Sequence, residues 1–200
     1  MELSIFQAAI LAAYYWFAAT RIVYSLIHIL RGPLMTSLFC GIVLGDVPTA
    51  IMIGAMIQPM FLAFTAAGGT IVWDECAAGM CGCTITILGG LDMSQALTIA
   101  VPISLLCAQL HALRRIFNIY PVQKADQYAK TCNTKGITFM CLWWPVIMEF
   151  FVFAIPMFLA LYFGAEAVGR IINNLPQWTT NALGITGKLL PALGFAMTIN

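Results

Sequence analysis

The sequence predicts an all-α integral membrane protein of several membrane-embedded (polytopic) helices, and its composition carries that prediction. Hydrophobic residues make up 62% of the chain, charged residues only 8%, and the mean hydropathy is +0.92. Soluble domains carry about 25% charged residues, so this chain lacks the side chains that a water-facing surface needs. Because a spanning helix takes about 20 apolar residues, the chain has room for about five or six crossings.

The first apolar segment covers residues 3–20, where Gln7 is the one strongly polar side chain. Residues 21–33 follow as a connection with a basic residue near each end and Gly32-Pro33 as punctuation. Their loosely amphipathic spacing predicts that they lie along the membrane interface.

The next apolar run, residues 34–56, contains Gly41 and Gly45 four positions apart. This spacing of small residues predicts a face that another helix approaches closely. Asp46 and Pro48 then interrupt the run. Asp46 either caps the helix that starts near Pro48 or belongs to a polar pathway, and the sequence leaves both interpretations open.

Residues 54–75 are apolar but repeatedly interrupted. The interrupting residues are Gln58, Pro59, the Gly68-Gly69 pair, Asp74 and Glu75. Irregular backbone at membrane depth needs protein or water around it, and transporters bind substrate at such broken helices. We therefore predict a re-entrant hairpin that turns between Thr65 and Thr70. The alternative is two short helices joined by an exposed turn, with Asp74 and Glu75 in water.

Two further apolar segments cover residues 76–91 and 93–113, with a turn at 89–92, and His111 near the end of the second is interpreted as an interface residue. Residues 114–136 then read as the only clearly soluble loop and hold five of the nine basic side chains. The positive-inside rule predicts that this loop is cytoplasmic.

The remaining chain reads as a long span at 139–163 that contains Glu149, a polar connection at 164–180, and a last apolar segment from 183. The chain stops in that segment without a charged flank. We therefore expect a single membrane-embedded domain over residues 1–200 that lacks its C-terminal part.

Several classes of function find no support in the sequence. No hydrolase, phosphate-binding, metalloprotease or dinucleotide motif occurs, so no intrinsic catalytic site and no cofactor are expected. The seven cysteines lie in apolar runs without metal-site spacing, which favours packing over a metal site. With a formal net charge of +1 and no basic stripe, nucleic-acid binding is also unsupported.

Several stretches together resemble the IIC subunit of the mannose/fructose/sorbose family of bacterial phosphotransferase (PTS) transporters. The matching stretches, in family order, are MELSIFQA, RGPLMTSLFCGIVLGD, GAMIQPMFLAFTAAGGTIVWDE, ALTIAVPISLL and the stretch from YFGAEAVGR to the last residue. The resemblance implies an elevator-type arrangement with re-entrant hairpins in the bacterial inner membrane. It also implies a IID membrane partner, homo-oligomers of IIC–IID pairs, and soluble IIA and IIB proteins that phosphorylate the sugar as it enters.

Substrate-binding candidates follow from the polar residues in the resembling stretches. They are Gln7, Gln58, Thr65, Gly68, Gly69 and Asp74. The chain departs from the family at Gln58, where a glutamate is typical, at Ala66, where an asparagine is common, and before Arg31, where an acidic pair is absent. For Gln7 the alternative is a helix-packing hydrogen bond. The alternative functions are a PTS-independent transporter or channel, or a degenerate regulatory membrane subunit.

Overall fold

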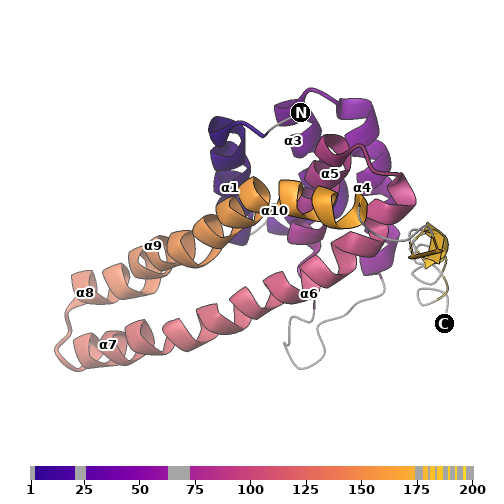
Figure 1. Ribbon diagram of the computed structural model, residues 1–200. Helices are drawn as coiled ribbons and strands as arrows, with labels where there is room; N and C mark the ends of the chain where they lie inside the picture. Colours follow the sequence, from indigo (N-terminus) through magenta and orange to yellow (C-terminus); the bar gives the residue numbers. More distant parts are fainter. Residues whose placement is uncertain are drawn as a thin grey trace.

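The computed structural model describes residues 3–20, 26–62 and 73–173, and scattered residues beyond 177; this part of the chain is helical and contains no strand. In chain order the helices are α1 (Ile5–Ala19), α2 (Ile27–Arg31), α3 (Pro33–Leu44), α4 (Val47–Leu62), α5 (Glu75–Gly89), α6 (Met93–Phe117), α7 (Ile119–Lys130), α8 (Thr134–Thr138), the π-helical turn η3 (Phe139–Trp143), α9 (Trp144–Glu149), the π-helical turn η4 (Phe150–Ala154) and α10 (Ile155–Asn173). Figure 1 shows α1–α5 gathered in one body with α10 and the first part of α6 against it, and the rest of α6 with α7–α9 projecting as a long hairpin.

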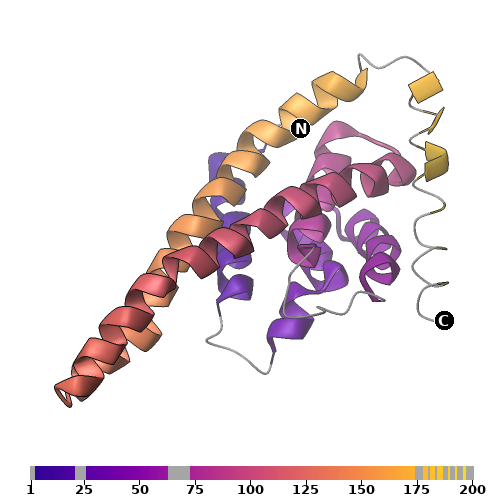
Figure 2. The same ribbon diagram turned by 90° about the horizontal axis from the view of Figure 1, so that it is seen from below.

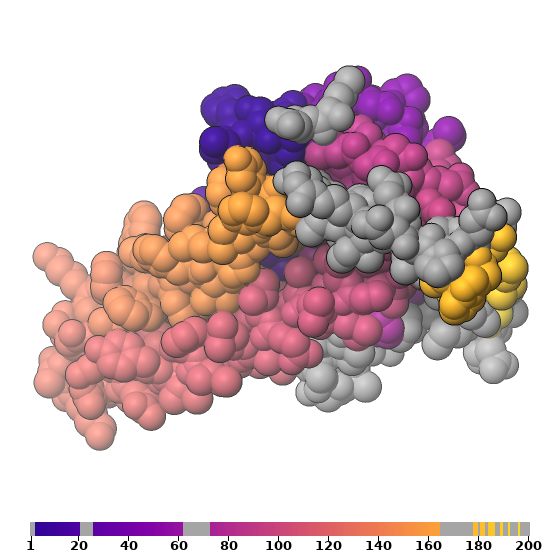
Figure 3. Space-filling model, viewed as in Figure 1, coloured from indigo at the N-terminus to yellow at the C-terminus, as the bar shows by residue number. Residues whose placement is uncertain are grey.

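The hairpin is the clearest feature of the molecule. Helices α6 and α7 run outward almost in line, and α8 to α10 return beside them, as Figures 1 and 2 both show. The space-filling view in Figure 3 shows that the outer end of the hairpin stands clear of the body. The span predicted at 139–163 lies inside one continuous helical run, Thr134–Gly164, which is long and apolar enough to cross a membrane.

Two predicted connections are helical instead. The loop expected at 114–136 is wrong, because α6 continues to Phe117, α7 follows almost at once, and only residues 131–133 form a turn. A soluble loop would expose its basic residues to water, but the Arg114 side chain is only 7% exposed and is paired with Glu149 inside the hairpin. The polar connection expected from 164 is likewise wrong up to Asn173, where α10 ends.

Helix length divides the described chain into two groups. Two runs are long and apolar enough to cross a membrane, Met93–Lys130 with 38 residues and Thr134–Gly164 with 31. Four apolar helices of 10–17 residues, α1, α3, α4 and α5, fall short of the about 20 residues that a full crossing needs. Fewer helices of full spanning length are therefore found in this part of the chain than the five or six expected.

The short helices pack through small residues. A Cβ on Gly41 would lie 2.5 Å from the Cβ of Ala50, so the close approach predicted at Gly41 is confirmed for α3 against α4. Gly45 has another role: its φ of 85° ends α3, and a Cβ there would meet nothing within 4 Å. Asp46 accepts a hydrogen bond from the backbone N–H of Thr49 at 3.2 Å, which is the capping interpretation.

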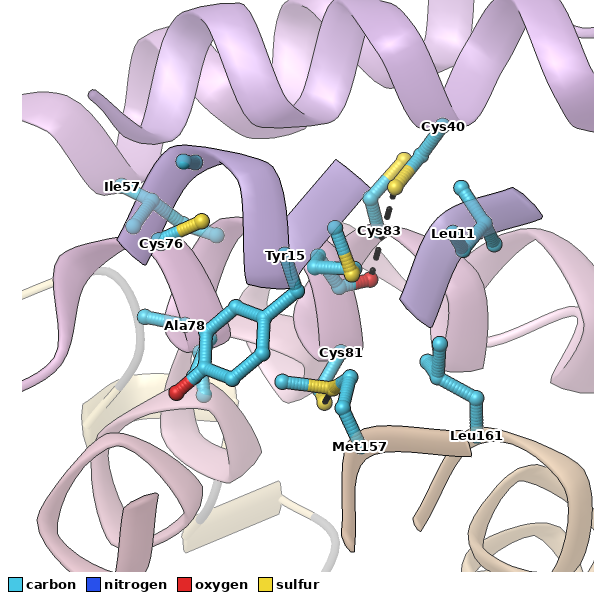
Figure 4. Close-up of a cluster of buried hydrophobic side chains, with 14 of the residues drawn as sticks. Leu11, Tyr15, Cys40, Ile57, Cys76, Ala78, Cys81, Cys83, Met157 and Leu161 are labelled. Atoms are coloured by element: carbon cyan, nitrogen blue, oxygen red, sulfur yellow. Dashed lines mark hydrogen bonds between the residues drawn. The ribbon is translucent and has the colours of Figure 1, made fainter. Parts of the chain in front are cut away.

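The core lies where α1, α3, α4 and α5 meet the returning helix. Figure 4 shows Leu11 and Tyr15 of α1 near Met157 and Leu161 of α10, with the sulfur of Cys81 directed toward Met157. The packing role predicted for the cysteines is confirmed for four that are buried: Cys40, Cys76, Cys81 and Cys83. The turn η4 brings the fully buried Phe153 against α1 and α6. Turns of the π type are rare in proteins and occur often at functional sites.

Candidate functional site

Asp74 is the centre of a buried polar cluster. It lies just before α5, where its Oδ1 accepts hydrogen bonds from the backbone N–H groups of Cys76 at 3.2 Å and Ala77 at 3.3 Å. An aspartate at this position satisfies N–H groups that the first helical turn leaves without partners. Its own backbone N–H donates to the carbonyl of Ser104 in α6 at 3.1 Å. Asp74 therefore joins α5 to α6 through its backbone.

Three other helices send side chains to the same carboxylate. The Tyr15 hydroxyl of α1 donates to Oδ2, the His111 Nε2 of α6 lies 2.9 Å from Oδ2, and the Arg31 Nη2 at the end of α2 lies 3.5 Å from Oδ1. Asp74 itself is 0% exposed. An ionised carboxylate is costly to bury unless it is paired and hydrogen-bonded, and here both oxygens have partners.

A second ion pair lies one turn further along α6. The Arg114 Nη1 donates to the Glu149 Oε1 at 3.2 Å, and the two side chains are only 8% and 6% exposed. Phe153 connects this pair with the Asp74 cluster, because its ring lies 4.9 Å from the His111 ring and 5.9 Å from the Arg114 guanidinium carbon. Ionisable groups therefore follow one face of α6 at the junction of body and hairpin.

Gln58 lies near the C-terminal end of α4 and caps the start of α3. Its Oε1 accepts the backbone N–H of Leu34 at 3.1 Å. The N-cap residue of α3 is Gly32, which has no side chain to accept a hydrogen bond from the first helical turn. Gln58 supplies that acceptor instead. The Gln58 amide nitrogen, which carries two N–H donors, makes no hydrogen bond within the described part of the chain.

The segment 31–34 links these two predicted site residues. Arg31 at its start binds Asp74, and Leu34 at its end binds Gln58. A Cβ on Gly32, between them, would lie 3.4 Å from the Gln58 Oε1. The structure thus brings Gln58 and Asp74 to one joint between α2 and α3.

Gln7 lies elsewhere. Its Nε2 donates to the carbonyl of Val43 at 3.0 Å, and its Oε1 accepts the N–H of Ser4 at 3.1 Å. The helix-packing alternative therefore describes the contacts of Gln7 in this structure. Val43 is nine residues from Leu34 along α3, which separates Gln7 from Gln58 by about 13 Å of helix.

Three of the predicted site residues, Thr65, Gly68 and Gly69, lie outside the described residues, as does the predicted re-entrant turn. The alternative of a solvent-exposed Asp74 is wrong, because that side chain is fully buried. Among the residues that the structure describes, no group of three or more histidine, cysteine or acidic side chains could hold a metal ion.

Sequence reasoning missed most of the cluster. Tyr15 and Arg31 were not singled out, and the interface interpretation of His111 is wrong, because the side chain is 1% exposed and bonded to Asp74. One signal was available, since ionisable residues inside apolar helices usually pair with one another. His111, Arg114 and Glu149 all meet that description.

Comparison with known proteins identifies the family of this chain. The family model described as "PTS system sorbose-specific IIC component" matches residues 5–200. The fructose permease IIC component of Bacillus subtilis (strain 168) is 29% identical over 168 residues, which are 84% of this chain and 62% of that protein. The mannose-specific EIIC component of Escherichia coli (strain K12) is 28% identical over 173 residues, 84% of this chain and 63% of that protein. The chain thus spans less than two thirds of these relatives.

Two solved structures share the fold over the whole chain. One, described only as a membrane protein, has a TM-score of 0.85 at 23% identity, and this chain covers 80% of it. The other is the cryo-EM structure of the mannose transporter ManYZ in complex with microcin E492, with a TM-score of 0.74 at 25% identity and again 80% of that chain covered.

Proposed function

This chain belongs to the family of sorbose-specific IIC components of the bacterial phosphotransferase system. From that premise we propose that it is an integral membrane sugar permease, which translocates a hexose or related sugar across the bacterial inner membrane. The observation that carries this proposal is the buried cluster of Asp74, Arg31 and His111 within otherwise apolar helices. Ionisable groups at such places are costly and mark substrate pathways.

The proposed site is built around the joint between α2 and α3. Gln58 offers two amide donors to sugar hydroxyls, and Asp74 holds the joint from the opposite side through Arg31. Thr65, Gly68 and Gly69 would complete the site as a re-entrant hairpin. Gln7 of α1, which donates to Val43 near the C-terminal end of α3, is the remaining candidate residue. Four apolar helices shorter than a bilayer crossing support a re-entrant arrangement.

We further propose a IID membrane subunit as partner, assembly into homo-oligomers of IIC–IID pairs, and phosphorylation of the sugar by IIA and IIB proteins. The ManYZ complex is a mannose transporter with this fold. The outer end of the hairpin carries Lys124, Lys130 and Lys135. This basic end is proposed to face the cytoplasm, following the positive-inside rule, within reach of IIB.

The test is phosphoenolpyruvate-dependent sugar phosphorylation by membrane vesicles that hold the full-length protein with its IID, IIA and IIB neighbours. A panel of hexoses, amino sugars and sorbose should contain one class whose phosphorylation is lost when this chain is omitted. Phosphorylation of every sugar at an unchanged rate without this chain would refute the proposal.

One observation favours a second candidate, the degenerate regulatory subunit. Both oxygens of Asp74 and both ends of Gln7 are engaged by the protein itself. If neither residue is released for a ligand, the chain assembles in the membrane without transporting. Intact assembly with no sugar dependence in the vesicle assay would select this candidate.

A further inference from the structure

Hydrogen bonds, one ion pair and a short stretch of backbone connect α6 with Gln58. His111 and Tyr15 hold the Asp74 carboxylate, Asp74 pairs with Arg31, and three residues later the N–H of Leu34 holds the Gln58 Oε1. Each non-covalent contact in this series is 3.5 Å or shorter, and the backbone of residues 31–34 joins Arg31 to Leu34. The series connects the projecting hairpin with the residue proposed to bind sugar.

Hydrogen-bond accounting favours one form of His111. Its Nε2 lies 2.9 Å from the Asp74 Oδ2 and 3.2 Å from the Arg31 Nη2. A carboxylate only accepts and a guanidinium only donates, so one ring nitrogen cannot serve both. The Nδ1 is buried and has no partner among the described residues. A hydrogen there would be a buried donor without a partner among those residues, which favours the form with its hydrogen on Nε2, donated to Asp74.

This assignment leaves Arg31 with Asp74 as its partner. The Arg31 guanidinium faces Asp74 at 3.5 Å, longer than a charge-assisted hydrogen bond of about 2.8 Å. The ion pair with Asp74 is therefore an attraction between charges that holds the guanidinium near the carboxylate. The orientation of that carboxylate is set by the His111 and Tyr15 donors on Oδ2 and by the two backbone N–H groups on Oδ1.

We propose that His111 is a positioning residue for sugar binding, acting on Gln58 through Asp74, Arg31 and Leu34 without touching the sugar. The inference rests on the proposed function, because it presumes that Gln58 binds the sugar. Its content is the coupling of two residues on different helices, 53 positions apart in the sequence (111 minus 58). A residue with only a packing role would not affect binding through Gln58.

The experiment measures sugar concentration at half-maximal uptake, and maximal rate, in vesicles that hold the full-length protein with its partner subunits. The variants are His111→Leu, His111→Gln, Gln58→Ala and the double variant His111→Leu/Gln58→Ala. Losing a hydrogen bond to a charged group should raise the half-maximal concentration about tenfold in His111→Leu. Glutamine keeps an N–H for Asp74, so His111→Gln should stay within about threefold of wild type.

The double variant separates positioning from packing. If His111 acts through Gln58, His111→Leu should add less than about twofold to the effect of Gln58→Ala, because coupled residues are not additive. Two effects that multiply fully would overturn the inference. So would His111→Gln behaving like His111→Leu.

A further variant, Tyr15→Phe, keeps the test informative if the His111→Leu protein does not accumulate in the membrane. Tyr15→Phe removes only the other donor to Oδ2, keeps the ring that packs 5.7 Å from Phe153, and should raise the half-maximal concentration about threefold. An unchanged value in Tyr15→Phe together with loss of His111→Leu would assign His111 to folding and overturn the inference. The matched control is His28→Leu, at an exposed histidine of α2, which should leave the value unchanged.

The outcomes distinguish this inference from the proposed function. If the wild-type protein supports no uptake of any sugar, the proposed function fails. If the wild-type protein supports uptake but Gln58→Ala leaves the half-maximal concentration unchanged, the proposed binding site is wrong, and the inference that depends on it is wrong as well. If Gln58→Ala weakens binding and His111→Leu does not, only the inference fails.

Discussion

The body of short helices and the projecting hairpin are held together in different ways. In the body, backbones approach closely at small residues, as where a Cβ on Gly79 would lie 2.3 Å from the Thr36 Oγ1. In the hairpin, large side chains also make contacts, such as the rings of Tyr120 and Trp144, whose centroids lie 5.7 Å apart. Many apolar side chains of the hairpin are exposed, Ile116 at 62% and Leu142 at 60% among them.

The polar residues lie where the two regions meet. Tyr15, Arg31 and Asp74 come from the body, whereas His111 comes from the hairpin. A membrane supplies little hydrophobic force between helices, so close packing and interhelical hydrogen bonds must hold them. The body uses the first and the junction uses the second. Substitutions in the two places should therefore differ in kind as well as in size.

The largest effect is expected from removing the carboxylate that joins the regions. Asp74→Ala leaves Arg31 and His111 without their acceptor and should lower the free energy of unfolding by about 3–5 kcal/mol. Thermal unfolding in detergent measures this. The matched control, Asp46→Ala, removes a simple cap at Thr49 and should cost about 1 kcal/mol. Equal losses in the two variants would mean that Asp74 is no more than a cap.

The ion pair inside the hairpin allows a sharper comparison. Glu149→Leu leaves Arg114 buried without its carboxylate and should cost about 3 kcal/mol. The double variant Arg114→Leu/Glu149→Leu should recover most of this loss, because apolar pairs often replace buried ion pairs without penalty. The measurement is unfolding in detergent for both variants. A double variant less stable than Glu149→Leu would show that the pair itself stabilises the hairpin.

Close packing should make Gly79 of the body more sensitive to one added methyl group than Gly164 of α10. Gly79→Ala forces α3 and α5 apart and should cost about 2 kcal/mol. Gly164→Ala in α10 meets nothing within 4 Å and should be neutral or stabilising by about 0.5 kcal/mol. Thermal unfolding of the pair tests the contrast, which fails if Gly79→Ala is tolerated equally well.

The smallest effect is expected at Gln58. Gln58→Ala removes the acceptor for the Leu34 N–H and should cost about 1 kcal/mol. Gln58→Glu keeps that acceptor and places a negative charge at the N-terminus of α3, so it should gain about 0.5 kcal/mol. Melting temperatures of the two variants give the comparison. A destabilised Gln58→Glu would argue against the capping role.

Features read correctly from the sequence are those with local causes. The turn at 89–92 follows from Gly89-Gly90, and Asp46 caps a helix whose third residue, Thr49, donates to it. The mistaken features have distant causes. Arg114 is buried with Glu149, 35 residues away, which accepts its hydrogen bond, and His111 is buried with Asp74, 37 residues away. No local pattern shows these pairings.

The sequence also could not tell which candidate site residues have their polar groups occupied by the protein itself. Gln7 and Gln58 look alike as single amides in apolar segments, but the protein engages both ends of Gln7 and leaves the Gln58 amide nitrogen open among the described residues. The difference arises from which backbone group each amide meets on α3. That depends on how the helices pack.

The length of the hairpin turns small movements at its base into large ones at its tip. From His111 to Lys130 the helical run covers 19 residues, or about 28 Å at 1.5 Å per residue. A tilt of α6 by about 10° around His111 would carry Lys130 through about 5 Å, one helical turn. A small tilt at the junction with Asp74 would therefore move the basic outer end of the hairpin by a much larger distance.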